Sequence, residues 1–266
     1  MHTSLARAIG AATCLLALSA AASAADLVAT YQFNGKLAAD QAGAPALTAL
    51  NGGTFVTESD VFGQARVVYQ RSGGADPSAQ SVLQLDTSGL GLTGNSYAVQ
   101  MVFRFDSGST EGYRRLVDGW NVDNLQDNGF YVGLNGRLSI YSNNSAEGGP
   151  VLANGQFHDV VLNVTPTGEQ AYANGAFAVS RTETPDAIQG STLSFFLDNS
   201  GEYANGQVAL IRVFSGSLTA DEVVALHNSG NPFPAAVPEP SSVLLMLAGL
   251  AGLGGWAARR RSTPAT

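Results

Sequence analysis

The sequence contains one cysteine, Cys14, and little charge of either sign. Because Cys14 lies in an apolar N-terminal run, the rest of the chain has no disulfide, no cysteine-ligated metal and no thiol nucleophile. Lys and Arg number 13 against 21 Asp and Glu, a formal charge of −8, which has the wrong sign for binding nucleic acid. Hydrophobic residues make up 45% of the chain and charged residues 13%, which excludes a chain that is disordered throughout.

Long hydrophobic runs occur only at the two ends. Near the N-terminus, Arg7 precedes an apolar stretch at residues 8–22, and small residues at 22–24 suit a cleavage site. The run is shorter than the ~20 residues that a spanning helix needs. We therefore predict that residues 1–24 are a signal peptide, cut by signal peptidase between Ala24 and Ala25. A retained N-terminal anchor is the alternative.

The C-terminal run has three parts in a fixed order. The motif Pro238-Glu239-Pro240 comes first, an apolar segment at 241–258 follows, and Arg259, Arg260 and Arg261 come last. The apolar segment has 18 residues, and at ~1.5 Å per residue it covers ~27 Å, which barely spans a hydrocarbon core. Because arginines stay on the cytoplasmic side, the body is expected to face outward.

This tail resembles the PEP-CTERM sorting signal in its motif, its Gly/Leu/Ala-rich helix and its arginine cluster. Such proteins belong to exosortase systems of Gram-negative bacteria that make extracellular polysaccharide. The resemblance implies export, a transient inner-membrane anchor with the C-terminus in the cytoplasm, processing by an exosortase, and display in the cell envelope or extracellular matrix. A permanent single-span anchor is the alternative that the helix leaves open.

One strand-rich domain is predicted at residues 25–230, followed by a proline-rich linker at 231–237 and the sorting signal at 238–266. Its short alternating segments, punctuated by Gly, Asn and Asp, are typical of an antiparallel sandwich or barrel. In the segment 97–105, alternation places Tyr97 and every second residue after it on one face, with Gln100 and Arg104 opposite.

Local signals add two hairpins and one helix. The pairs Asn135-Gly136 and Asn174-Gly175 lie between strand candidates, and each favours a type I′ turn. A capping-box pattern runs from Thr219 to Glu222 before an apolar stripe, which predicts a short closing helix.

The order of these elements resembles the LamG-like, concanavalin A-like jelly-roll superfamily, an all-β fold of two antiparallel sheets. The resemblance is carried by residues 31–35, by 155–160 with 172–175, and by 206–214 with 218–223. Two positions depart from the family. Ala209 stands where an acidic residue is often found, and Phe157 stands where Trp is usual. The first departure weakens any family calcium site carried through that acidic position.

Catalysis is not expected. A glycosidase on this fold needs two carboxylates that flank the scissile bond, and the glutamates of the body are predicted to lie in loops, namely Glu58, Glu111, Glu147, Glu169, Glu183 and Glu202. His158 alternates with apolar residues, so we interpret it as a hydrogen-bonded strand residue and not as a base. A divergent glycoside hydrolase or lyase is the weaker alternative.

Two polar loop segments are the candidate ligand or metal rim. They combine carboxylates and amides, which ligate calcium or hydrogen-bond sugars, with an aromatic plate. Each is also compatible with an ordinary solvated turn. The residues are Asp118, Trp120, Asn121, Asp123, Asp127, Asp198, Asn199 and Glu202.

The surface charge favours cations as ligands. Without the two ends, residues 25–237 keep nine basic and 20 acidic residues, a net charge of −11. No cofactor is established, and calcium is the candidate. The sequence thus predicts a non-enzymatic, exported protein that binds extracellular polysaccharide, a surface glycan or a protein partner. A structural matrix component without a discrete site is the second hypothesis.

Overall fold

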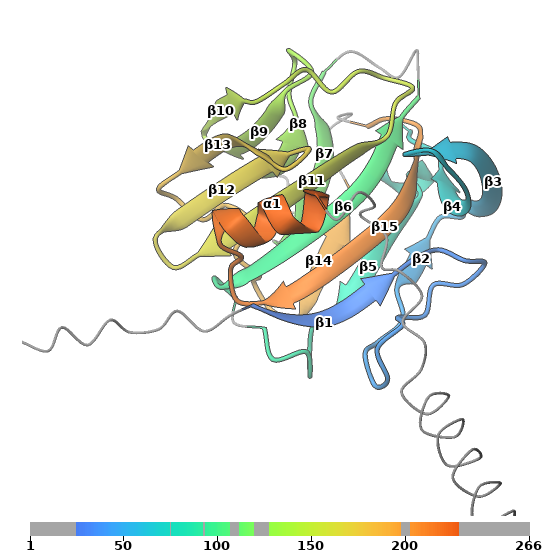
Figure 1. Ribbon diagram of the computed structural model, residues 1–266, viewed down its shortest axis with the longest axis horizontal. Coiled ribbons are helices and arrows are strands. Elements are labelled where there is room, and N and C mark those ends of the chain that lie inside the picture. Colours follow the sequence, from blue (N-terminus) through green and yellow to red (C-terminus); the bar gives the residue numbers. More distant parts are fainter. Residues whose placement is uncertain are drawn as a thin grey trace, which may run out of the picture.

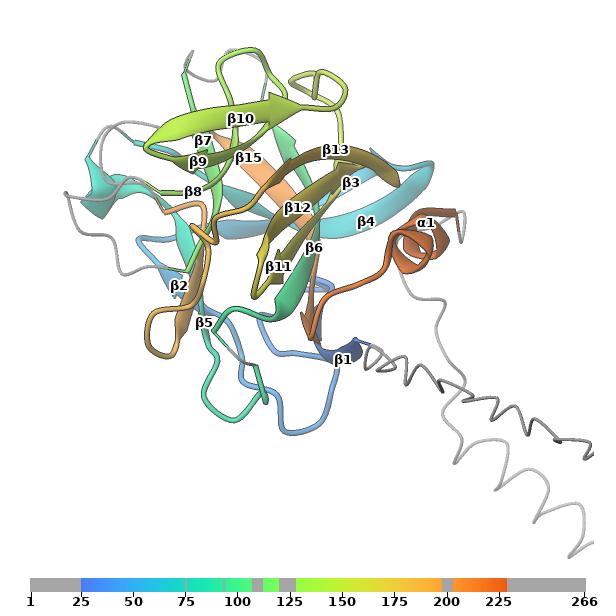
Figure 2. The same cartoon turned by 90° about the vertical axis from the view of Figure 1, so that its left-hand side faces the viewer.

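The computed structural model describes residues 25–74, 76–92, 94–106, 112–119, 128–197 and 203–228. These residues form two antiparallel sheets packed face to face, with one α-helix outside the first sheet (Figures 1 and 2). The predicted all-β sandwich is confirmed. The predicted signal peptide and sorting signal lie outside these ranges, and within them no helix has the length and apolar character to cross a membrane.

Sheet A has eight strands. Its order is β13-β12-β11-β6-β15-β4-β3, and β1 pairs with the part of β15 that lies beyond β4. The strands are β1 (Asp26–Tyr31), β3 (Thr54–Val61), β4 (Gln64–Arg71), β6 (Tyr97–Phe105), β11 (His158–Thr165), β12 (Gly168–Ala173), β13 (Ala176–Arg181) and β15 (Gly206–Ser215).

Sheet B has seven strands in the order β10-β9-β8-β7-β14-β5-β2. A 3₁₀ turn, η1 (Pro77–Ala79), precedes β5. The strands are β2 (Thr48–Leu50), β5 (Val82–Asp86), β7 (Arg114–Asp118), β8 (Gly129–Val132), β9 (Leu138–Ser142), β10 (Asn144–Gly148) and β14 (Thr192–Phe195).

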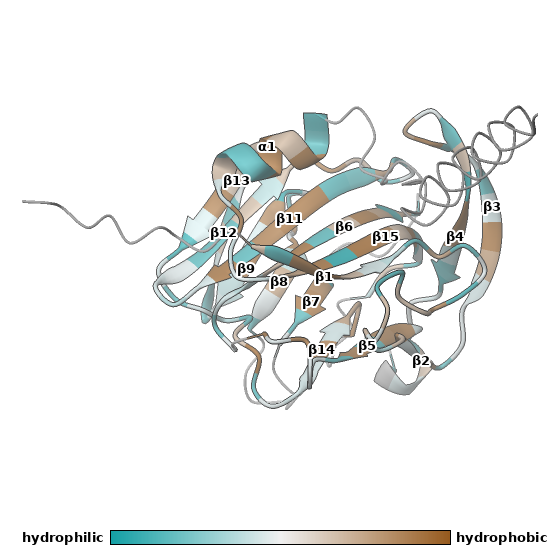
Figure 3. Ribbon diagram, turned by 60° about the horizontal axis from the view of Figure 1, so that its bottom comes forward, coloured by the Kyte–Doolittle hydropathy of each residue, from teal (hydrophilic) through white to brown (hydrophobic). Residues whose placement is uncertain are grey.

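The main core lies between the two sheets, and alternation along the strands builds it. In β6, Tyr97, Val99, Met101, Phe103 and Phe105 all join this core, as the sequence predicted. Figure 3 shows hydrophobic and hydrophilic segments alternating along β6 and β15. Burying one such large side chain stabilises the fold by about 1.5–3 kcal/mol, so the sandwich stands without a disulfide.

The outer face of sheet A is covered by α1 (Ala220–Asn228), which Figure 1 shows lying across this sheet. Its capping box is confirmed, because Thr219 N donates to Glu222 Oε2 at 2.7 Å and Glu222 N donates to Thr219 Oγ1 at 3.2 Å. Val223 packs in a cluster with Ala98. A second, smaller hydrophobic core therefore lies between α1 and the outer face of sheet A.

The two predicted hairpin turns have different outcomes. Asn174 and Gly175 have φ angles of 50° and 78° and join β12 directly to β13, as a type I′ turn requires. At Asn135-Gly136 the predicted hairpin is confirmed, because β8 and β9 pair antiparallel, but the predicted type I′ turn is wrong. Of these two residues only Gly136 has a positive φ, and Gly136 N donates to Gly133 O at 2.9 Å. β8 and β9 are joined by five residues, so the turn sits inside a longer loop.

Candidate functional site

Three tyrosines gather on the outer face of sheet B, and we call them the tyrosine face: Tyr113, Tyr131 and Tyr141. Every pair of the three rings is in edge contact. The centroid of the Tyr113 ring lies 5.8 Å from that of Tyr131 and 5.9 Å from that of Tyr141. The centroids of Tyr131 and Tyr141 are 6.3 Å apart. Such edge-to-face contacts hold aromatic rings in fixed orientations.

Side chains alternate between the two faces along β8 and β9, and this alternation turns Tyr131 and Tyr141 outward. Phe130 and Val132 belong to the main core, so Tyr131 between them points to the other face. Leu138 and Ile140 are also core residues, which turns Tyr141 outward in the same way. The sequence analysis did not single out these tyrosines, although the alternation around them carries the signal.

A buried ion pair supports the tyrosine face from β7. Arg115 Nη1 donates to Asp118 Oδ2 at 3.0 Å, and both side chains are 2% exposed. Arg115 Nε donates to Tyr131 Oη at 2.6 Å, and its Nη2 donates to Asn128 O at 3.2 Å. The guanidinium also lies 4.8 Å from the centroid of the Tyr131 ring. Arg115 therefore fixes Tyr131 by hydrogen bonds and by a cation–π contact.

Asp118 is the one predicted rim residue that lies within the described ranges. Its carboxylate is buried and is paired with Arg115. The other predicted residues lie outside the described ranges and stay a prediction: Trp120, Asn121, Asp123, Asp127, Asp198, Asn199 and Glu202.

Asp118 and Phe195 precede the two predicted loop segments and lie on neighbouring antiparallel strands. In the pair of β7 and β14, Asp118 lies opposite Ser194 and Val117 lies opposite Phe195. Because these strands run in opposite directions, Gly119 and Phe196, the residues that follow them, leave the pair at opposite ends. The two predicted segments themselves lie outside the described residues.

The described residues contain no group of three or more His, Cys, Asp or Glu side chains able to hold a metal ion. Ala209 is fully buried at a bulge in β15, where the register shifts between Val208 and Leu210. An alanine side chain offers no oxygen ligand, so the late strand cannot supply a calcium site through this position. Calcium at the rim residues stays a prediction.

The prediction that the body's glutamates lie in loops is wrong for three of them. Glu58 is in β3, Glu147 in β10 and Glu169 in β12. Each of these strands pairs with a strand next to it in the sequence, and the polar residues around each glutamate concealed the strand pattern. Glu169 is fully buried, which no local signal indicated.

Glu169 and Asp186 form a buried carboxyl pair. Asp186 N donates to Glu169 Oε1 at 2.7 Å, while Glu169 Oε2 and both side-chain oxygens of Asp186 have no hydrogen-bond partner. Burial raises the pKa of Glu169 to about 8, and burial together with the Glu169 carboxyl raises the pKa of Asp186 well above its ordinary value. At neutral pH the pair therefore keeps a proton.

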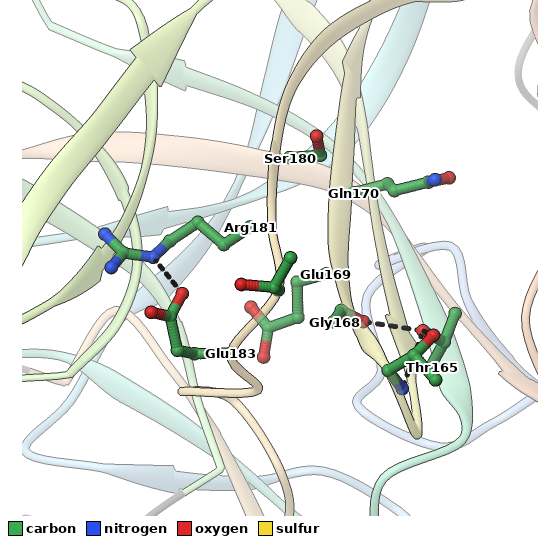
Figure 4. A pocket seen from close by; sticks show the side chains of 9 residues that line it. Thr165, Gly168, Glu169, Gln170, Ser180, Arg181 and Glu183 are labelled. Atoms are coloured by element: carbon green, nitrogen blue, oxygen red, sulfur yellow. Dashed lines mark hydrogen bonds and ion pairs between the residues drawn. The ribbon is translucent and has the colours of Figure 1, made fainter.

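A polar groove of about 450 Å³ lies beside this pair (Figure 4). In the figure Glu169 and Gln170, neighbours in β12, point to opposite sides. Arg181 is bound to Glu183 at 3.0 Å and donates to carbonyl groups of sheet B, among them Ser142 O at 3.2 Å. The groove is lined by Thr165, Thr167, Gly168, Glu169, Gln170, Ser180, Arg181, Thr182 and Glu183.

This arrangement does not suit hydrolysis. A glycosidase needs both carboxyl groups to reach the substrate, whereas Glu169 and Asp186 are each 0% exposed. His158 lies against the ring of Phe103, and its Nε2 is 2.9 Å from Ala153 O. Burial lowers the pKa of His158. The interpretation of His158 as a hydrogen-bonded strand residue is confirmed.

Comparison with protein families agrees with this fold. Residues 77–224 match the Concanavalin A-like lectin/glucanases superfamily, which is more than half of the chain. The chain belongs to this superfamily. Residues 236–261 match the PEP-CTERM protein-sorting motif. Both predicted resemblances are confirmed. The sorting motif follows the superfamily domain in the sequence. No curated protein matches the chain.

Solved structures share the fold of this superfamily member at low sequence identity. One is domain 4 of AbnA, an extracellular arabinanase from Geobacillus stearothermophilus, in complex with arabinotriose. It is 20% identical with a TM-score of 0.59, over 77% of this chain and 99% of that one. The binding domain of Paraclostridial Mosquitocidal Protein 1 is 14% identical with a TM-score of 0.56, over 77% and 52%. Trypanosoma rangeli sialidase is 11% identical with a TM-score of 0.53, over 76% and 32%.

Proposed function

We propose that this protein is an exported, surface-displayed carbohydrate-binding protein without enzymatic activity. The observation that carries the proposal is the tyrosine face, an aromatic cluster held by a buried ion pair on the outside of a lectin-type sandwich. Aromatic rings with a few fixed polar groups beside them are typical of ligand sites. The arabinotriose complex of domain 4 of AbnA supports sugar as the ligand class.

Two further findings support the non-enzymatic part. The carboxyl groups that come together, Glu169 and Asp186, are inaccessible to a substrate, and binding domains are among the similar structures. The sorting motif supports display by an exosortase at the surface of a polysaccharide-producing cell.

We expect the full chain, purified in a sugar-free detergent, to be retarded in gels that contain one of a panel of polysaccharides, arabinan included. Replacing Tyr141 by Ala is expected to weaken this binding ~10-fold or more, because truncating an aromatic anchor at the centre of a site costs over 1 kcal/mol. Phe177→Ala is the matched control, since Phe177 is a 56% exposed aromatic residue of sheet A. Retardation by no polysaccharide, or equal losses in the two variants, would contradict the proposal.

Processing has its own test. If an exosortase reads Pro238-Glu239-Pro240, Glu239→Ala should leave an uncut precursor in the membrane fraction of the producing cell. The mass of the chain recovered from the surface and membrane fractions measures this. A mature mass that is the same in the variant and in the natural protein would show that the motif is not read.

A further inference from the structure

We propose that the tyrosine face binds neutral polysaccharide chains and discriminates against chains that carry carboxylates. This inference rests on the proposed function, because it names the class of glycan that the same face takes. It is carried by the exposure of two rings, by the polar groups that share their face, and by the local charge.

Two of the three rings remain accessible. Tyr131 is 1% exposed and forms the base of the cluster, whereas Tyr113 and Tyr141 are half-buried. Their edge contacts with each other and with Tyr131 fix their orientation before any ligand arrives. Preorganised aromatic surface binds an apolar sugar face at little cost in conformational entropy.

The register places hydrogen-bonding groups beside the rings. Ser145 lies opposite Tyr141, and Glu147 lies opposite Ser139, so these side chains share the outer face of sheet B. One Glu147 oxygen accepts from Asn135 Nδ2 at 2.9 Å. A carboxylate has about four acceptor sites, so Glu147 retains acceptor capacity for a sugar hydroxyl.

The buried cation of this face is paired, because Arg115 lies against Asp118. Arg137 donates to the neutral Gly149 O and keeps its charge at an exposed position. Glu147 is half-exposed and is bound to a neutral amide. The body as a whole carries a net charge of −11 between residues 25 and 237. A carboxylate ~4 Å from Glu147 would be repelled by about 1 kcal/mol even at the dielectric constant of water.

The test compares each neutral polysaccharide with a form of the same polymer whose primary hydroxyls are oxidised to carboxylates. Affinity electrophoresis of the full chain is run on both forms at low salt. We expect ~10-fold or greater preference for the neutral form, since repulsion acts at several sugar units of one chain. Glu147→Gln should reduce this preference ~5-fold, because it removes the local charge and keeps the shape.

Asp221→Asn is the matched control, because it makes the same charge change at an exposed position of α1, outside sheet A and away from the tyrosine face. Its preference ratio should equal that of the natural protein. Tighter binding of the oxidised forms, or equal ratios in the two variants, would overturn the inference and leave the proposed function standing. If the protein binds neither form of any polysaccharide, both this inference and the proposed function are wrong.

Discussion

Raising the pH from about 5 to about 8 is expected to destabilise the folded body by several kcal/mol, because Glu169 and Asp186 keep a proton that the unfolded chain has already lost. The pair is buried, and three of its carboxyl oxygens accept no hydrogen bond. Ionising both groups would place two negative charges side by side with a single backbone donor, Asp186 N, which a protein interior opposes strongly.

The raised pKa of Glu169 means that folding stability falls as the pH rises. The pKa of Glu169 is raised from 4.5 to about 8, so between these values the folded state holds more protons than the unfolded state. The contribution of Glu169 to the free energy of unfolding is complete below the unfolded pKa. Above that pKa it falls by about 1.4 kcal/mol per pH unit for each proton. The loss ends once the pH passes the folded pKa.

The charged groups that face the pair do not neutralise it. Tyr97 faces it from β6, where burial and then the nearby carboxylates raise the pKa of its phenol. Arg115 on β7 is occupied by Asp118, and Arg181 on β13 is bound to Glu183 and to sheet B. Protonation of the pair therefore takes the place of a counter-ion.

Urea unfolding of the full chain at a series of pH values measures this effect. Glu169→Gln keeps an acceptor for Asp186 N and removes the ionisation, so its stability should depend much less on pH. Glu183→Gln is the control, because Glu183 is exposed and its pKa is lowered. His158 and His227 titrate in all three chains, so their contributions cancel. A Glu169→Gln slope as steep as that of Glu183→Gln would refute the role of the pair.

The second large effect concerns the ion pair beneath the tyrosine face. Arg115→Met is expected to lower the free energy of unfolding by about 3–5 kcal/mol, because it leaves the buried Asp118 carboxylate without this partner. The Arg115–Asp118 distance is 3.0 Å with both side chains 2% exposed. The urea midpoint, at an unchanged slope with denaturant, measures the loss.

The control is Arg104→Met. Arg104 pairs with Glu58 at 3.1 Å, but these side chains are 20% and 21% exposed, so the expected loss is about 1 kcal/mol or less. The double variant Arg115→Met/Asp118→Leu should recover much of the stability, because no buried charge is left unpaired. Additive losses in the double variant would show that the two side chains do not act as a pair.

Features that depend on neighbours in the sequence could be predicted. The core face of β6, the capping box at Thr219 and the Asn174-Gly175 turn all follow from residues within a few positions of one another. The sorting motif is equally local. Such features need no partner strand, because side-chain alternation and turn geometry are set by the backbone itself.

The candidate site required the pairing of three consecutive strands. Tyr113, Tyr131 and Tyr141 come from three segments that only the order β9-β8-β7 brings together. The turn at Asn135-Gly136 was mispredicted because the length of the connection depends on where β8 and β9 end. The polar segments around Glu58 and Glu147 became strands because neighbouring strands satisfied their backbone.

The sequence by itself determined the fold class, the strand faces and the sorting signal, because each is written in local spacing. The tertiary structure alone decided which charges are buried. Glu169 meets Asp186 across 17 residues, and Asp118 is buried beside Arg115. Burial depends on which strands cover a residue, and that coverage is set by contacts between segments far apart in the chain.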